Sequence, residues 1–141
     1  MEVRLSDIRK HFGPVKANDG ITLTVPAGTI QGILGENGAG KSTLMKILSG
    51  FQPADSGQIL LDGQKVDMRS PADAIRHGVG MLHQDPMDFP PMRVVDNLLI
   101  GAPGRLIPRR SEAMAAIGEL AGSLGLSVDL KAEVGSLTLG E

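Results

Sequence analysis

Residues 35–43 have the residue types and the spacing that phosphate binding requires. They read Gly-Glu-Asn-Gly-Ala-Gly-Lys-Ser-Thr and fit the pattern G-x-x-x-x-G-K-S/T. Glycines at positions 35, 38 and 40 allow positive φ and close backbone approach, so that successive amide N–H groups can converge on an anion. The helix expected to begin near Gly40 adds partial positive charge at the same point. The stretch therefore predicts a site for the phosphates of a nucleotide.

Two side chains of this loop have distinct expected roles. Lys41 would place its ammonium group at the β- and γ-phosphates, and the Ser42 hydroxyl would ligate Mg²⁺. The alternative is a flexible glycine loop beside a surface lysine, because the chain holds 19 glycines in 141 residues. The strand-like and helix-like segments on either side favour phosphate binding. The residues expected to hold the nucleotide are Gly35, Glu36, Asn37, Gly38, Ala39, Gly40, Lys41, Ser42 and Thr43.

Such a loop needs a strand before it and a helix after it. Residues 29–34 form a mainly apolar run that we expect to be the strand. Beyond the loop, Leu44, Ile47 and Leu48 recur at helical spacing, and Gly50 suits the end of that helix. The order strand, loop and helix indicates an α/β core.

Antiparallel strands are predicted around this core. The expected strands are residues 2–9, 21–25, 58–61 and 65–68. Asp62-Gly63, between the last two, is typical of a tight hairpin turn. The run from Ile59 to Asp62 also looks like an apolar strand that ends in a Mg²⁺-binding aspartate. The hairpin signal favours a turn residue instead.

The composition changes near residue 84. Before it, Ser70-Pro71 predicts the start of a helix that runs to His77, and residues 78–83 read as a short buried strand. After it come three prolines within residues 85–91, which block both helix and ladder hydrogen bonds. The expected helices that follow are residues 94–100 and 109–123, the second with Ala113, Ile117, Leu120 and Leu124 on one face. We therefore expect a nucleotide-binding core with an antiparallel β subdomain over residues 1–84 and a helical subdomain over 85–141.

Composition excludes several classes of protein. Apolar residues make up 41% of the chain and its net charge is −2, so neither disorder nor a basic nucleic-acid-binding surface is indicated. The absence of cysteine excludes disulfides and thiolate metal sites. No apolar run reaches the length of a membrane span and no signal peptide is visible, which predicts a soluble cytoplasmic chain. Aromatic stacking would have to use Phe12, Phe51 or Phe89.

Four elements of the sequence together resemble the ATP-binding subunit of an ABC transporter. The residues of the loop at 35–43 resemble those of the same loop in that family. Residues 10–19 resemble the N-terminal segment of importer subunits for simple sugars and nucleosides. Gln84 follows residues 80–83, where the family has its Q-loop glutamine. Leu137-Thr138-Leu139-Gly140-Glu141 resembles the signature sequence LSGGQ, with Thr for Ser, Leu for Gly and Glu for Gln.

The resemblance implies a fold and a set of residue roles. The fold is an α/β P-loop NTPase core with an N-terminal antiparallel β subdomain and a helical subdomain. Phe12 would stack on the adenine of ATP, and Gln84 would contact Mg²⁺ or the attacking water. The signature residues Leu137, Thr138, Leu139, Gly140 and Glu141 would act on nucleotide held by a second ABC domain.

The resemblance also implies a function and partners. The expected function is coupling of ATP binding and hydrolysis to solute import, with membrane-spanning permease subunits contacted near residues 85–99 and no nucleic acid partner. The protein would lie at the inner face of the cell membrane. The sequence stops before the family's Walker B strand and catalytic glutamate, so we expect this chain alone to bind nucleotide without hydrolysing it. The alternatives are a truncated nucleotide-binding fragment and a soluble ABC ATPase outside transport.

Overall fold

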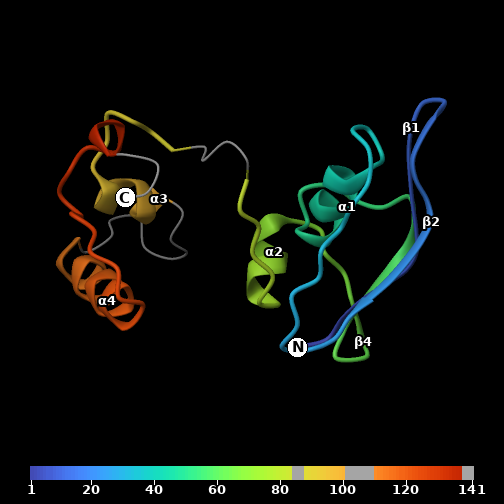
Figure 1. Ribbon diagram of the computed structural model, residues 1–141, viewed down its shortest axis with the longest axis horizontal. Coiled ribbons are helices and arrows are strands. Elements are labelled where there is room, and N and C mark those ends of the chain that lie inside the picture. The colour runs from blue at the N-terminus through green and yellow to red at the C-terminus, as the bar shows by residue number, and fades with distance from the viewer. Residues whose placement is uncertain (84–87, 101–109, 138–141) are drawn as a thin grey trace. The chain divides into compact units, whose positions relative to one another are not determined.

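The computed structural model describes residues 1–83, 88–100 and 110–137 of the chain (Figure 1). It forms two compact units, residues 1–82 and residues 83–141. Gln84 and residues 138–141, which carry part of the expected site, lie outside the described residues.

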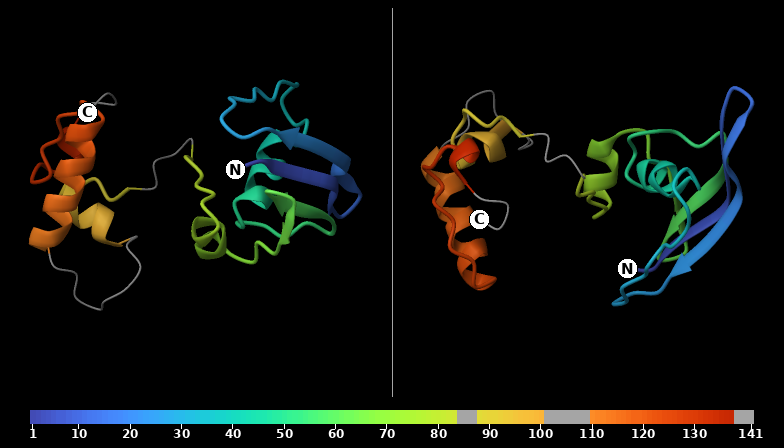
Figure 2. Two further views of the ribbon diagram at one scale, coloured as in Figure 1. Left: turned by 90° about the horizontal axis from the view of Figure 1, so that it is seen from below. Right: turned by 45° about the horizontal axis from the view of Figure 1, so that its top comes forward.

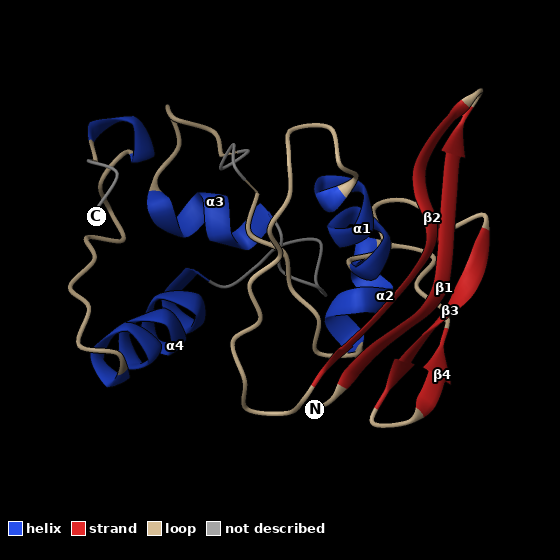
Figure 3. Ribbon diagram, turned by 45° about the vertical axis from the view of Figure 1, so that its right-hand side comes forward, coloured by secondary structure: helices blue, strands red, loops and turns tan. Residues whose placement is uncertain are grey.

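The first unit is built on a four-stranded antiparallel sheet with the order β2-β1-β3-β4 (Figure 3). The strands are β1 (Val3–Phe12), β2 (Val15–Val25), β3 (Ser56–Leu61) and β4 (Gln64–Val66). All four predicted strands are confirmed, but β1 and β2 extend further than their apolar alternation indicated. The extension is polar, and cross-strand pairs such as Arg9 opposite Asp19 stabilise it in place of apolar contacts.

The β3–β4 hairpin turns at the predicted dipeptide. Asp62 and Gly63 both have positive φ, 47° and 79°, as a two-residue turn with the right-handed strand twist requires. The Asp62 carboxylate accepts a hydrogen bond from the backbone N–H of Glu2 at 2.7 Å. Asp62 therefore tightens the sheet at the start of β1, in agreement with its interpretation as a turn residue.

Two helices pack on one face of this sheet (Figures 1 and 2). They are α1 (Lys41–Leu48) and α2 (Pro71–Arg76), and both were predicted. Ser70 caps α2 by accepting a hydrogen bond from the backbone N–H of Asp73 at 3.1 Å. The buried core between helices and sheet consists of Leu5, Ile8, Leu44, Ile47, Ile59, Leu61, Met68 and Ala74.

Two predicted strands of the first unit are not formed. Residues 29–34 and 78–83 form no strand, and Ile30, Leu34 and Leu82 are fully exposed. An interior strand is stabilised by hydrogen bonds to neighbours on both sides and by burial of both faces. No strand within the described residues pairs with either segment. The apolar composition of these two segments therefore did not suffice to predict a strand, because pairing partners are also required.

The second unit contains the helices α3 (Val94–Ile100) and α4 (Arg110–Ser123) and the short 3₁₀ helix η1 (Val134–Ser136). Both α-helices were predicted. A bridge between Arg93 and Glu133 joins the start of α3 to the region before η1, and Val95 and Leu130 are buried. The apolar face predicted for α4 is not buried, since Leu120 and Leu124 are 61% and 64% exposed. Across the described segments, every helix is too short or too polar to cross a membrane.

Candidate functional site

The glycine-rich loop leads directly into helix α1, as its pattern predicted. Gly38 and Gly40 have φ of 84° and 83°, and the backbone N–H of Ala39 donates to the carbonyl oxygen of Glu36 at 3.2 Å. Gly35 does not adopt the left-handed region. A Cβ atom there would lie 3.4 Å from the Cβ of Ala39, which is an ordinary van der Waals distance.

The start of α1 is open to an anion. Gly40 occupies the N-cap position in the left-handed conformation, and no side chain caps the helix. The N–H groups of the first turn have no acceptor inside a helix, and they carry the positive end of its dipole. The first turn contains no acidic residue that would occupy this position. The geometry fits a phosphate group.

Lys41 is folded back over the loop that precedes it. Its ammonium nitrogen lies 2.7 Å from the carbonyl oxygen of Gly35 and 2.8 Å from that of Glu36. The charge is thus held beside the loop, next to the open helix start. Ser42 is exposed on the first turn of the same helix. The structure therefore brings the loop, the ammonium group and a free hydroxyl to one place.

Sequence reasoning missed the residue that anchors this loop to the sheet. Asn18 of β2 is only 3% exposed, and its Nδ2 donates to the carbonyl oxygen of Gly40 at 3.3 Å. The approach is close, because a Cβ atom on Gly40 would lie 2.0 Å from the carbonyl oxygen of Ala17. A buried asparagine within a polar strand gave no sequence signal of this role.

Phe12 lies at the end of β1, beside the turn to β2, and is 51% exposed. In the strand register Lys10 is opposite Asn18, and Phe12 follows Lys10 by two residues. Because side chains alternate along a strand, Phe12 lies on the same face of the sheet as Asn18, which contacts α1. The phosphate-binding loop and the predicted stacking residue thus belong to one face of the first unit.

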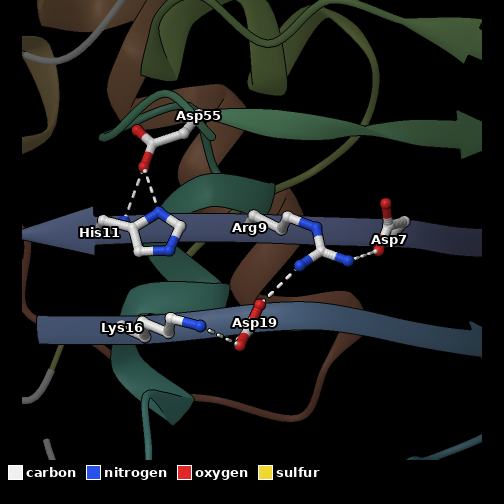
Figure 4. Close-up of polar contacts among 6 residues, drawn as sticks. All are labelled: Asp7, Arg9, His11, Lys16, Asp19 and Asp55. Atoms are coloured by element: carbon white, nitrogen blue, oxygen red, sulfur yellow. Dashed lines mark hydrogen bonds and ion pairs between the residues drawn. The ribbon is translucent and has the colours of Figure 1, made fainter.

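Charged groups surround the end of the β1–β2 hairpin (Figure 4). Arg9 contacts Asp19 at 2.6 Å, and Lys16 contacts the other oxygen of Asp19 at 3.1 Å. The hydrogen bond from Lys16 is the largest cause that lowers the pKa of Asp19. Asp55 contacts Lys10 at 2.8 Å and the ring of His11 at 3.2 Å. Sequence reasoning assigned no role to Asp55.

Two hollows of the first unit lie away from the glycine-rich loop. The larger, about 460 Å³, is lined by Ile8, Ile47, Gln52, Pro53, Ala54, Gly57, Gln58, Ile59, Lys65, Val66, Asp67 and Met68. A smaller apolar one of about 200 Å³ is lined by Val3, Leu5, Leu23, Val25, Gln31, Ile33, Met45 and Leu48. We identify the site from the loop, because a shallow ring of backbone N–H groups binds phosphate without a deep cavity.

The remaining predicted site residues are not assembled with the loop. Leu137 follows η1 in the second unit, where its backbone N–H donates to the carbonyl oxygen of Val134 at 3.1 Å. Gln84, Thr138, Leu139, Gly140 and Glu141 lie outside the described residues. The roles predicted for these residues stay predictions.

A glycine-rich loop that leads directly into a helix is part of the arrangement found in P-loop NTPases. The sequence profile of the ABC transporter family matches residues 18–141, which is most of the chain. The chain therefore belongs to the ABC transporter family and contains part of its ATP-binding domain.

Curated relatives of known name are similar over nearly the whole chain. A ribose import ATP-binding protein of Chromobacterium violaceum is 44% identical over 100% of this chain, and an arabinose import ATP-binding protein of Burkholderia lata is 39% identical over 99%. A glucose import ATP-binding protein of Haloferax volcanii is 43% identical over 91%. The chain spans only 26–29% of the length of these three relatives.

Solved structures confirm the fold. A nucleotide-free ATP-binding cassette of an ABC transporter superposes with a TM-score of 0.84 at 32% identity and covers 98% of this chain. A cassette of an ABC transporter in its ADP conformation gives a TM-score of 0.83, also at 32% identity. The chain covers 60% of each of these structures.

Proposed function

We propose that residues 35–43 bind the triphosphate of ATP together with Mg²⁺, and that the chain is the ATP-binding part of a solute importer. The uncapped, left-handed start of α1 at Gly40, with Lys41 folded over the adjacent loop, is the observation that carries this proposal. A helix N-terminus with free N–H groups and a neighbouring ammonium group is suited to a polyanion. The family membership and the ADP conformation of a similar cassette support the same ligand.

The contacts of Lys41 indicate how this side chain would act. Its present acceptors, the carbonyl oxygens of Gly35 and Glu36, are neutral. Hydrogen bonds between an ammonium group and phosphate oxygens are charge-assisted and about twice as strong as neutral ones. Phosphate would therefore draw Lys41 from the loop carbonyls. Ser42 would supply its hydroxyl to Mg²⁺, whose chemistry there is to neutralise charge on the phosphates.

Other predicted residues complete the proposal. Phe12 would stack on adenine from the same face of the sheet. Gln84 would contact Mg²⁺ or water, and the signature residues 137–141 would close over nucleotide held by a second ABC domain. These roles rest on the family resemblance.

The transported solute is proposed from the relatives. All three relatives are import ATP-binding proteins for sugars, so we assign this chain to an importer of a simple sugar. The alternative is a nucleoside importer, because residues 10–19 also resemble subunits of that type. Permease subunits would be its membrane partners and would hold it at the inner face of the membrane. Because the chain spans less than a third of the length of these relatives, we propose transport for a protein of their full length.

We propose that hydrolysis also belongs to the longer protein. Phosphoryl transfer to water requires a residue that orients the water and a second acidic Mg²⁺ ligand. Asp62, the apolar-strand aspartate of this sequence, lies in the β3–β4 turn with its carboxylate on the backbone of Glu2. Asp62 is thus not available as that acidic ligand, and the residues assigned to the site support nucleotide binding alone.

Titration with a fluorescent ATP analogue tests the core of this proposal. Lys41→Ala should weaken binding by about 1.5–3 kcal/mol, because it removes a hydrogen bond to a charged group. Lys46→Ala is the matched control, since it removes an exposed lysine from the later part of the same helix. Equal affinity of the wild-type chain and Lys41→Ala would contradict the proposal.

A further inference from the structure

We propose that Asp55 is a positioning residue for the base of the nucleotide: it fixes Lys10, and Lys10 fixes the Phe12 ring on which the base stacks. This inference rests on the proposed function and deepens it. Asp55 itself touches neither phosphate nor base. It would act at a distance from the phosphate-binding loop, through the end of the β1–β2 hairpin.

Asp55 forms hydrogen bonds with three consecutive residues near the end of β1, Arg9, Lys10 and His11. One carboxylate oxygen lies 2.8 Å from Nζ of Lys10. The other accepts from the backbone N–H of His11 at 2.6 Å and contacts Nδ1 of His11 at 3.2 Å (Figure 4). The backbone N–H of Asp55 also donates to the carbonyl oxygen of Arg9 at 2.9 Å. The segment immediately before Phe12 is therefore held from one side by a single residue.

Lys10 carries this constraint to the aromatic ring. Its side chain is only 13% exposed, although a lysine on a hairpin end is ordinarily free in solvent. Its ammonium nitrogen lies 5.9 Å from the centroid of the Phe12 ring, within the range of a cation–π contact. The ammonium group thus bridges the carboxylate of Asp55 and one face of the ring.

The ring of Phe12 would be poorly ordered without the contact from Lys10. It lies beside the turn, its side chain is half exposed, and its strand partner Val15 is 60% exposed. A ring with little packing around it samples several rotamers, and ordering it on binding costs conformational entropy. With the ammonium group over one face of the ring, the other face is left for a flat ligand. A ring ordered in advance would stack on a base at lower cost.

The ion pair persists at the pH of the cytoplasm. Lys10, followed by the backbone N–H of His11, holds the pKa of the Asp55 carboxyl at about 2. Asp55 is therefore ionised at neutral pH, where its carboxylate lies beside the Lys10 side chain.

The test compares two ligands that differ only in the presence of a base and ribose. Binding of Mg²⁺–ATP and of Mg²⁺–tripolyphosphate to the 141-residue chain is measured by calorimetry. Asp55→Asn should weaken ATP binding about threefold to tenfold, the value of one aromatic stacking contact, and leave tripolyphosphate binding unchanged. Lys10→Gln and Phe12→Ala should show the same selective loss. Phe12→Ala combined with Asp55→Asn should lose no more than Phe12→Ala alone, because the two act through one ring.

Asp19→Asn is the matched control. It removes an exposed carboxylate that, like Asp55, makes two ion pairs with the β1–β2 hairpin, and it should change neither affinity. Equal weakening of both ligands by Asp55→Asn, or weakening of neither, would overturn the positioning role. The same holds if Lys10→Gln leaves ATP binding intact. Failure of the wild-type chain to bind either ligand would overturn the proposed function, and the inference with it. Circular dichroism spectra verify that each variant is folded as the wild type.

Discussion

Asn18 donates a hydrogen bond from Nδ2 to the carbonyl oxygen of Gly40 at 3.3 Å. This contact joins β2 to the N-cap residue of α1. The two residues are 22 positions apart in the sequence. The carbonyl oxygen of Gly40 also accepts the first hydrogen bond of the helix, from Leu44 at 2.9 Å. The contact therefore fixes the position of the helix start, and with it the N–H groups proposed to bind phosphate, against the sheet.

Substitutions of Asn18 should destabilise the first unit in a defined order. Asn18→Ala loses the hydrogen bond to Gly40, at a cost of about 1 kcal/mol in the free energy of unfolding. Asn18→Asp should cost more, about 3 kcal/mol, because it places a buried carboxylate against a carbonyl oxygen without a donor between them. Urea denaturation measures both values. An Asn18→Asp variant as stable as Asn18→Ala would contradict the donor role of Asn18.

Gly40→Ala should be far more damaging than an alanine at another left-handed glycine. Both Gly40 and Gly28 have positive φ, 83° and 71°. At Gly28 a Cβ atom would meet nothing within 4 Å, whereas at Gly40 it would lie 2.0 Å from the carbonyl oxygen of Ala17. We expect a loss of about 1–2 kcal/mol for Gly28→Ala from backbone strain alone. Gly40→Ala should lose a further 1–3 kcal/mol, roughly, from overpacking.

Thermal unfolding of the two glycine variants, side by side, measures this difference. Gly40→Ala should also lose binding of the fluorescent ATP analogue, because the loop cannot keep its path against β2. Gly28→Ala should bind as the wild type does. Equal stability of the two variants would show that the loop is not packed against Ala17 in solution.

The ion pairs of Asp55 predict an acid-dependent part of the stability. Its pKa is lowered from the ordinary 3.8 to about 2 in the folded chain, chiefly by the hydrogen bond from Lys10. Between these values the unfolded chain binds more protons, so this contribution is complete above about pH 4 and is lost as the pH falls to about 2. Urea denaturation of the wild-type chain and of Asp55→Asn should give different stabilities at pH 5 and converging ones near pH 2. A constant difference across this range would contradict the ionised pair.

The sequence by itself determined the elements whose signals are local. The glycines of residues 35–43, the Asp62-Gly63 turn and the Ser70-Pro71 cap each specify backbone angles or a hydrogen bond within a few residues. The structure confirms the turn, the cap and the helix that follows the glycine-rich loop. The motif at residues 35–43 by itself also indicates the family.

Only the tertiary structure decided which residues support that loop. Asn18 meets Gly40 across 22 positions and Asp55 meets His11 across 44, and no pattern in the sequence encodes either contact. The same reason explains the error at residues 29–34. A strand exists only where other strands supply its hydrogen bonds, so its formation depends on neighbours in space and not on its own apolar residues.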